Sequence, residues 1–187
     1  MEAFSDGVLA VIITIMVLDM KPPHATGIAA LWPTAPVFFS YVLSFVYIGI
    51  YWNNHHHLLH AIDRVNGATL WANLHLLFWL SLIPFTTAWL GENHLAPWPV
   101  ALYGIVLCLA GFAYYILTIV LIRAQAGGSP LEEAVGRDKK TLISLVVYVC
   151  SIPLAFLQPW IACAGYIFVA IFWLIPDRRI ENRIAAG

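Results

Sequence analysis

Long apolar runs, each about the length of a membrane-spanning helix, constrain this chain more than any other feature. The chain has 187 residues, of which 61% are hydrophobic and 10% are charged, whereas soluble domains carry roughly 25% charged residues. Lipid offers the backbone no hydrogen-bond partners, so helices that satisfy their own backbone groups suit such runs. The runs are continuous rather than alternating, which argues against a transmembrane β-barrel. The sequence therefore predicts an all-α integral membrane protein.

Prolines, glycines and charged residues divide the apolar runs into six predicted membrane spans. These spans lie at about 4–20, 35–60, 67–90, 98–122, 140–157 and 160–176. The last two are short and are separated only by Gln158-Pro159, which predicts a tight turn. We therefore expect residues 1–187 to form a single six-helix transmembrane domain.

The basic residues predict the orientation of these spans. If the N-terminus is cytoplasmic, the outer segments hold only Lys21, and eight of the nine lysines and arginines fall in inner segments. Those eight are Arg64, Arg123, Arg137, Lys139, Lys140, Arg178, Arg179 and Arg183. By the positive-inside rule, this split predicts a multi-pass protein of the cell membrane with both termini inside, and Trp71 and Trp160 near opposite membrane interfaces.

A carboxylate stands at the head of the first predicted span, in Phe4-Ser5-Asp6-Gly7. Ionisable groups at membrane depth are costly and usually mark a functional site. The topology brings polar residues of the first three spans to the same inner depth. The expected cluster comprises Ser5, Asp6, Asn53, Asn54, His55, His56, His57, Asn73 and His75. We interpret Ser5, Asp6, Asn54, His55, His56 and Asn73 as a hydrogen-bond network that fixes the first helix. The alternative is that Ser5 and Asp6 cap that helix while the others line the membrane interface.

The histidines His55, His56, His57 and His60 could also indicate a metal site, or a haem ligand pair with His75. Consecutive residues of a helix point about 100° apart, so one helix cannot direct His55, His56 and His57 at one metal. We therefore expect no metal and no cofactor. The three cysteines lie in apolar runs, where they act as small hydrophobes. No basic cluster indicates a nucleic-acid partner.

At helical spacing, Gly7, Val11, Thr14, Ile15 and Leu18 form one uncharged stripe on the first span. The stripe is either an ordinary lipid or bundle face, or the wall of a pore with hydrophobic constrictions. A pore would need symmetric copies of the chain, because six helices in one subunit leave no evident aqueous path. Periodicity alone leaves both interpretations open.

Strings in the first three predicted spans resemble the transmembrane protein 175 family of endolysosomal potassium channels, in its prokaryotic branch. The most specific is Glu2-Ala3-Phe4-Ser5-Asp6-Gly7-Val8-Leu9-Ala10, followed by Thr14 and Leu18. Supporting strings are Trp52-Asn53-Asn54-His55-His56, Asn73-Leu74 and Ile83-Pro84-Phe85-Thr86. Together they cover the first half of the chain.

This resemblance implies a homotetrameric, potassium-preferring cation channel in which the first helix of each six-helix subunit lines the pore. Matched by position, Val11, Ile15 and Leu18 would form the hydrophobic constriction, and Thr14 an adjoining hydroxyl layer. Val11 stands where the family usually carries a larger Ile or Leu. Asp6 is then expected to organise the helix rather than to bind the ion.

We therefore predict a channel and not an enzyme, with potassium ions, the lipid bilayer and further copies of the chain as its partners. At its outer mouth, Asp19 and Glu92 outnumber Lys21 and would attract cations. One alternative is a small proton-coupled secondary transporter that uses Asp6 and the histidines as a relay. A second alternative is a membrane haem or metal protein.

Overall fold

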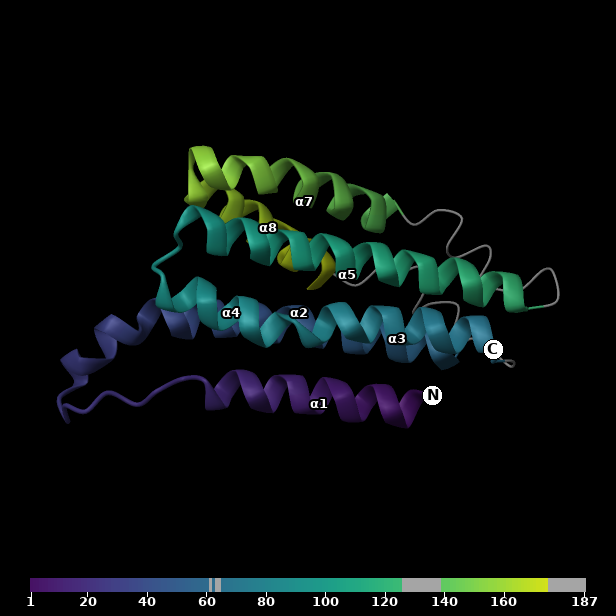
Figure 1. Ribbon diagram of the computed structural model, residues 1–187, viewed down its shortest axis with the longest axis horizontal. Coiled ribbons are helices and arrows are strands. Elements are labelled where there is room, and N and C mark those ends of the chain that lie inside the picture. The colour runs from purple at the N-terminus through teal and green to yellow at the C-terminus, as the bar shows by residue number, and fades with distance from the viewer. Residues whose placement is uncertain (61, 63–64, 126–138, 175–187) are drawn as a thin grey trace.

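The computed structural model describes residues 1–60, 62, 65–125 and 139–174, and these residues form helices and connecting loops without a strand (Figure 1). The helices, in chain order, are α1 Glu2–Leu18, η1 Ile28–Thr34, α2 Ala35–His60, α3 Gly67–Ser81, α4 Ile83–Glu92, α5 Pro97–Ala124, α7 Lys139–Leu157 and α8 Pro159–Leu174. The described part of the chain confirms the all-α prediction. Arg64, Arg137, Arg178, Arg179, Arg183 and the last two residues of the sixth predicted span lie outside it.

The helices run along one long axis, and successive passes alternate in direction, with α3 and α4 together making one pass (Figure 1). We call the end at which α1 begins and α2 finishes, with His55, His56 and His60, the histidine end. The other end, with Lys21 and Glu92, is the opposite end. Helix α1 lies along one edge of the bundle and α7 along the other, with the remaining helices between them.

Among the residues that the structure describes, four helical segments are long and apolar enough to cross a membrane by length and composition. They are Ile28–His60, Gly67–Glu92, Pro97–Ala124 and Lys140–Leu157. Helix α8 is apolar but shorter, with 16 residues, and α1 has 17 residues, a length of about 25 Å. A helix lies in each of the six ranges that the sequence marks as a span, while the crossing of α1 and α8 stays a prediction.

Prolines set the places where the helices begin and break. The range 67–90, expected as one span, is divided at Leu82, which ends α3 and precedes α4. Pro84 has no N–H to donate to the carbonyl of Leu80, and its ring crowds that carbonyl, so the helix is interrupted just before it. Gln158 alone separates α7 from α8, as expected of a tight turn: its N–H closes α7 on the carbonyl of Leu154 at 2.8 Å, and its carbonyl accepts from the N–H of Ile161 in α8 at 3.0 Å.

Buried hydroxyl groups join the helices inside the bundle. The hydroxyl oxygen of Ser44 lies 2.6 Å from that of Thr87 and 3.0 Å from that of Tyr103, which links α2, α4 and α5. The Tyr47 hydroxyl donates to the carbonyl of Tyr166 in α8 at 2.6 Å. In an apolar surrounding an unpaired hydroxyl is costly, so these bonds fix which faces of the helices meet.

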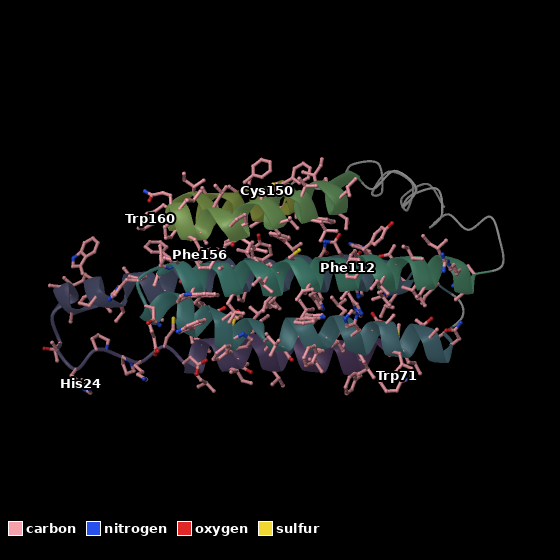
Figure 2. The ribbon with its side chains drawn as sticks, turned by 45° about the horizontal axis from the view of Figure 1, so that its top comes forward. His24, Trp71, Phe112, Cys150, Phe156 and Trp160 are labelled. Atoms are coloured by element: carbon pink, nitrogen blue, oxygen red, sulfur yellow. The ribbon has the colours of Figure 1, made fainter. Side chains whose placement is uncertain are left out.

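Several tryptophan and phenylalanine side chains lie on the outside of the bundle. Trp71 and Trp160 are mostly exposed, and Figure 2 shows them near opposite ends of the molecule. Trp98 and Phe156 pack edge to face, with their ring centroids 4.9 Å apart. Tryptophans at both ends of an apolar bundle are typical of the two membrane interfaces.

Candidate functional site

Helix α1 docks onto the bundle through one narrow face. Ser5, Leu9, Ile12 and Met16 are buried, with at most 3% of each residue exposed. They recur at the spacing that places side chains on one side of a helix, and they meet α2, α3 and α4. These buried residues leave the other side of α1 without cover from its own chain.

The opposite face of α1 carries the predicted stripe, and the chain leaves it uncovered. Exposed fractions are 55% for Val11, 44% for Ile15 and 79% for Leu18, and Gly7 and Thr14 are exposed too. The Thr14 hydroxyl donates to the carbonyl of Val11 at 2.8 Å. A hydroxyl oxygen has two acceptor lone pairs, so this bond leaves the oxygen of Thr14 free to face a cation.

Ser5, Asn73 and His55 form a buried chain of hydrogen bonds that ties α1 to α3 and α2. The Asn73 amide donates to the Ser5 hydroxyl at 2.9 Å, and its carbonyl oxygen lies 2.7 Å from His55 Nε2. Because that oxygen can only accept, His55 Nε2 carries a proton. All three residues are at most 2% exposed. This arrangement, the Ser5–Asn73–His55 chain, fixes the rotation of α1 about its own axis.

The other predicted network residues lie at the histidine end but make separate contacts. The Asp6 carboxylate accepts from the Trp52 indole N–H at 3.1 Å, not from the histidines or asparagines. Asn54 donates to the carbonyl of Ile50 in its own helix at 2.8 Å. His56 Nδ1 lies 3.0 Å from a carboxylate oxygen of Glu2. The structure therefore ties α1 to its neighbours at two places rather than through one network. One is the buried Ser5–Asn73–His55 chain, and the other combines the Asp6–Trp52 and Glu2–His56 contacts, which adjoin because the Trp52 ring stacks on His56.

In the described part of the chain, the remaining residues of the expected cluster show no hydrogen bond to α1, whereas two residues that link α1 to α2 were not predicted. Asn53 and His57 are exposed, and His75 Nε2 accepts from Trp79 in its own helix at 2.9 Å. The sequence did not lead us to expect that Glu2 of α1 contacts α2, or that Trp52 of α2 contacts α1. The available signal was their spacing: Trp52 and His56 stand four residues apart, as do Glu2 and Asp6, so each pair shares a helix face.

At the opposite end, an open groove lies between α1 and α4. Its lining residues are Ile15, Leu18, Asp19, Lys21, Ser81, Pro84, Phe85, Ala88 and Glu92. Lys21 Nζ lies 3.8 Å from a Glu92 oxygen, and both side chains are largely exposed, so this ion pair is weak. The end of the uncovered stripe thus meets an acidic, solvent-accessible rim.

The fold and this site define a class of protein: an all-helical, multi-pass membrane protein whose first helix is docked by one face and bare on the other. The sequence profile described as "Endosomal/lysosomal potassium channel TMEM175" matches residues 1–84. A protein of Chryseobacterium sp. strain P1-3, named a potassium channel, is 53% identical over 98% of this chain and 96% of its own length. The chain belongs to the TMEM175 family.

Two further comparisons extend across nearly the whole chain. A potassium channel of Streptomyces collinus is 32% identical over 100% of this chain and 96% of its own length. The crystal structure of a lysosomal potassium-selective channel TMEM175 homolog from Chamaesiphon minutus superposes with a TM-score of 0.82. It covers 93% of this chain and 94% of that chain at 24% identity, and it shows that the two share a fold.

Proposed function

We propose that this chain is one subunit of a homotetrameric, potassium-preferring channel of the cell membrane, with α1 lining the pore. One observation carries the proposal: α1 buries one face against its own subunit and leaves the opposite, uncharged stripe bare. Four copies around an axis would place four such stripes toward one another. The names of the relatives, potassium channels, support the choice of ion and argue against an enzyme.

Val11, Ile15 and Leu18 are the proposed constriction. They succeed one another along the bare face of α1, so each would contribute one ring of four branched apolar side chains. Narrow apolar rings control conduction by excluding water, and a hydrated ion cannot pass until such a ring widens or wets. The oxygens of Thr14, left free to accept, would offer the passing cation a ring of polar contacts between the apolar rings.

Six spans, with both termini inside, complete the proposal. Arg123 in the last turn of α5 and Lys140 in the first turn of α7 both belong to the histidine end, and Lys21 belongs to the opposite end. This distribution supports a cytoplasmic histidine end. The groove with Asp19 and Glu92 then opens on the outer side, where its carboxylates would concentrate cations.

Asp6 has a positioning task in this proposal. Its carboxylate accepts from Trp52 of α2 beside the buried Ser5–Asn73–His55 chain, and it is not part of the bare stripe. Contacts of this kind set which face of α1 meets the axis. They give Asp6 and the histidines a role that needs no proton relay, so the channel is favoured over the proton-coupled transporter and over a haem or metal protein.

Potassium flux into liposomes tests the assignment of the pore. Val11→Asn, Ile15→Asn and Leu18→Asn put a polar amide in each ring, which should wet the constriction, raise flux and weaken the preference for potassium over sodium. Val17→Asn makes the same change on an exposed part of α1 beside the stripe, and it should leave the ion preference as it is. If none of the three stripe variants alters flux or preference, α1 does not line the pore.

A further inference from the structure

Glu2, His56 and His60 converge at the histidine end, from two different helices. The Glu2 oxygen Oε1 lies 3.0 Å from His56 Nδ1 and 3.5 Å from His60 Nδ1. The ligating atoms of the three side chains all lie within 4.8 Å of one another. Glu2 belongs to the first turn of α1, and the two histidines belong to the last turns of α2.

The three donors match a metal site in type and in spacing. His56 and His60 stand four residues apart, which puts both imidazoles on one face of α2; their ring centroids are 4.1 Å apart. Two imidazoles and a carboxylate are a common ligand set for zinc, with a fourth position left to water. At metal–ligand distances of about 2.0–2.1 Å, a tetrahedral site holds its ligand atoms about 3.3 Å apart. The two measured distances to Glu2 bracket that value.

The surroundings orient the ligands and leave a path for a metal. The Trp52 ring stacks on His56, with an interplanar angle of 24°, and its N–H donates to Asp6. The side chains of Glu2, His56 and His60 are 42%, 38% and 59% exposed, so water and metal reach them. His60 Nδ1 donates to the carbonyl of His56 at 3.1 Å. To bind a metal through this nitrogen, His60 would give up that hydrogen bond and carry its proton on Nε2 instead.

We propose that Glu2, His56 and His60 form a binding site for a divalent transition metal of the zinc class. Imidazole ligands favour such metals over magnesium or calcium, which prefer all-oxygen sites. The expectation of no metal weighed His55, His56, His57 and His60 as donors of one helix, whose three consecutive members cannot meet at one metal. The structure supplies a different set: two histidines one helical turn apart, and a carboxylate from another helix.

A metal at this site would bind the start of α1 to the end of α2. If α1 lines the pore as proposed above, the metal restrains the helix that must move when the constriction widens. Zinc on the histidine-end side therefore slows potassium flux. Only this consequence depends on the proposed function, since binding of the metal itself does not.

Metal binding is measured on the full chain, purified in detergent with a C-terminal tag that contains no histidine and stripped with a chelator. After equilibrium dialysis against micromolar Zn²⁺, we expect one zinc per subunit, and cobalt in its place gives the visible absorption bands of a tetrahedral site. His60→Ala and Glu2→Gln should weaken binding by about tenfold or more. His57→Ala, which removes an exposed neighbouring imidazole, should leave it unchanged.

Two results overturn the site: a wild-type chain that binds no stoichiometric zinc, or binding that survives both His60→Ala and Glu2→Gln. Either would mean that Glu2 and His56 only contact each other and do not share a metal. Flux assays on the same samples separate this inference from the proposed function. Zinc should slow flux through the wild type but not through His60→Ala. A chain that binds zinc and conducts no potassium refutes the proposed channel and leaves the metal site standing.

Discussion

Asn73 occupies the centre of the attachment between α1 and the rest of the subunit. Its amide donates to Ser5 on α1, and its carbonyl oxygen accepts from His55 on α2, so one side chain joins three helices. Both neighbours are as deeply buried as Asn73 itself. Removing the amide therefore breaks two interhelical hydrogen bonds and leaves the Nε2–H of His55 without its partner, while the Ser5 hydroxyl keeps its bond to the carbonyl of Met1 at 3.2 Å.

Asn73→Leu should lower the stability of the folded chain by about 1–3 kcal/mol, since hydrogen bonds between membrane helices contribute about 0.6 kcal/mol each on average and up to about 1.7. Thermal unfolding in detergent, followed by tryptophan fluorescence, measures the effect. Asn53→Leu is the matched control, because Asn53 is exposed on α2. An unchanged Tm for Asn73→Leu would show that the chain of hydrogen bonds does not hold α1.

Thr14→Val removes one hydroxyl from the bare stripe and keeps the size of the side chain. If the Thr14 oxygens contact the passing cation, the variant should still conduct but discriminate less between potassium and sodium. Reversal potentials under bi-ionic conditions measure the preference. Thr118→Val serves as the control, because the Thr118 hydroxyl bonds its own helix in the same manner but is buried inside the subunit. Equal preference in both variants would remove Thr14 from the ion path.

The sequence predicted which residues gather at the histidine end but not how they pair. Topology brings Ser5, Asp6, Asn73 and His55 to one depth; which of the adjacent Ser5 and Asp6 turns inward depends on the rotation of α1. The structure buries the hydroxyl and leaves the carboxylate half-exposed beside Trp52. Burying a charged carboxylate costs far more than burying a hydroxyl. The periodicity of the sequence does not reflect this difference in burial cost, so it does not predict which of the two side chains is buried.

At the scale of the helices, the sequence predicted most helix ends to within a few residues but missed the break between α3 and α4. The predicted range 35–60 coincides with α2, and prolines near other boundaries gave similar agreement. Hydropathy does not mark the break at Leu82, because Leu82, Ile83 and Pro84 all continue the apolar run. The break comes from the missing N–H of Pro84, which a count of apolar residues cannot register.

The contact between α2 and α4 depends on Gly91. A Cβ atom at this position would lie 2.7 Å from the Cα of Val37, which is backbone and cannot move aside as a side chain can. We expect Gly91→Ala to destabilise the subunit by about 1–3 kcal/mol, the usual cost of overpacking, despite the gain of about 1 kcal/mol in helix propensity. Thermal unfolding in detergent checks this expectation.

Gly49→Ala on α2 is the matched control, because nothing lies within 4 Å of a Cβ there. It brings the same gain in propensity without the clash, so its Tm should equal or exceed that of the wild type. If Gly91→Ala is as stable as Gly49→Ala, the two helices do not approach as closely as the structure has them.

On the scale of the whole molecule, the subunit exposes two apolar edges, and we expect one to contact lipid and the other to contact further subunits. The edge formed by α7 carries large side chains such as Phe156 and Val149, which suit contact with lipid. The edge formed by α1 includes the exposed Gly7 and Thr14, and small residues of this kind allow helices to approach one another in membranes. Because the two edges lie on opposite sides of the bundle (Figure 1), convergence of the α1 edges on one axis would leave the α7 edges facing lipid.

This arrangement predicts an assembly of four chains, with a mass four times 20.8 kDa, about 83 kDa, by native mass spectrometry in detergent. It also predicts which residues of α1 cross-link. In a chain whose native cysteines are replaced, Leu18→Cys lies on the bare stripe, with the wild-type residue 79% exposed, whereas Met16→Cys lies on the docked face, with the wild-type residue 2% exposed. A disulfide forms only when two Cα atoms come within about 7 Å. Oxidation should therefore join subunits through position 18 and not through position 16. Cross-linking at position 16 alone would put the docked face at the axis and reverse the proposed orientation of α1, and a monomeric mass would exclude the pore.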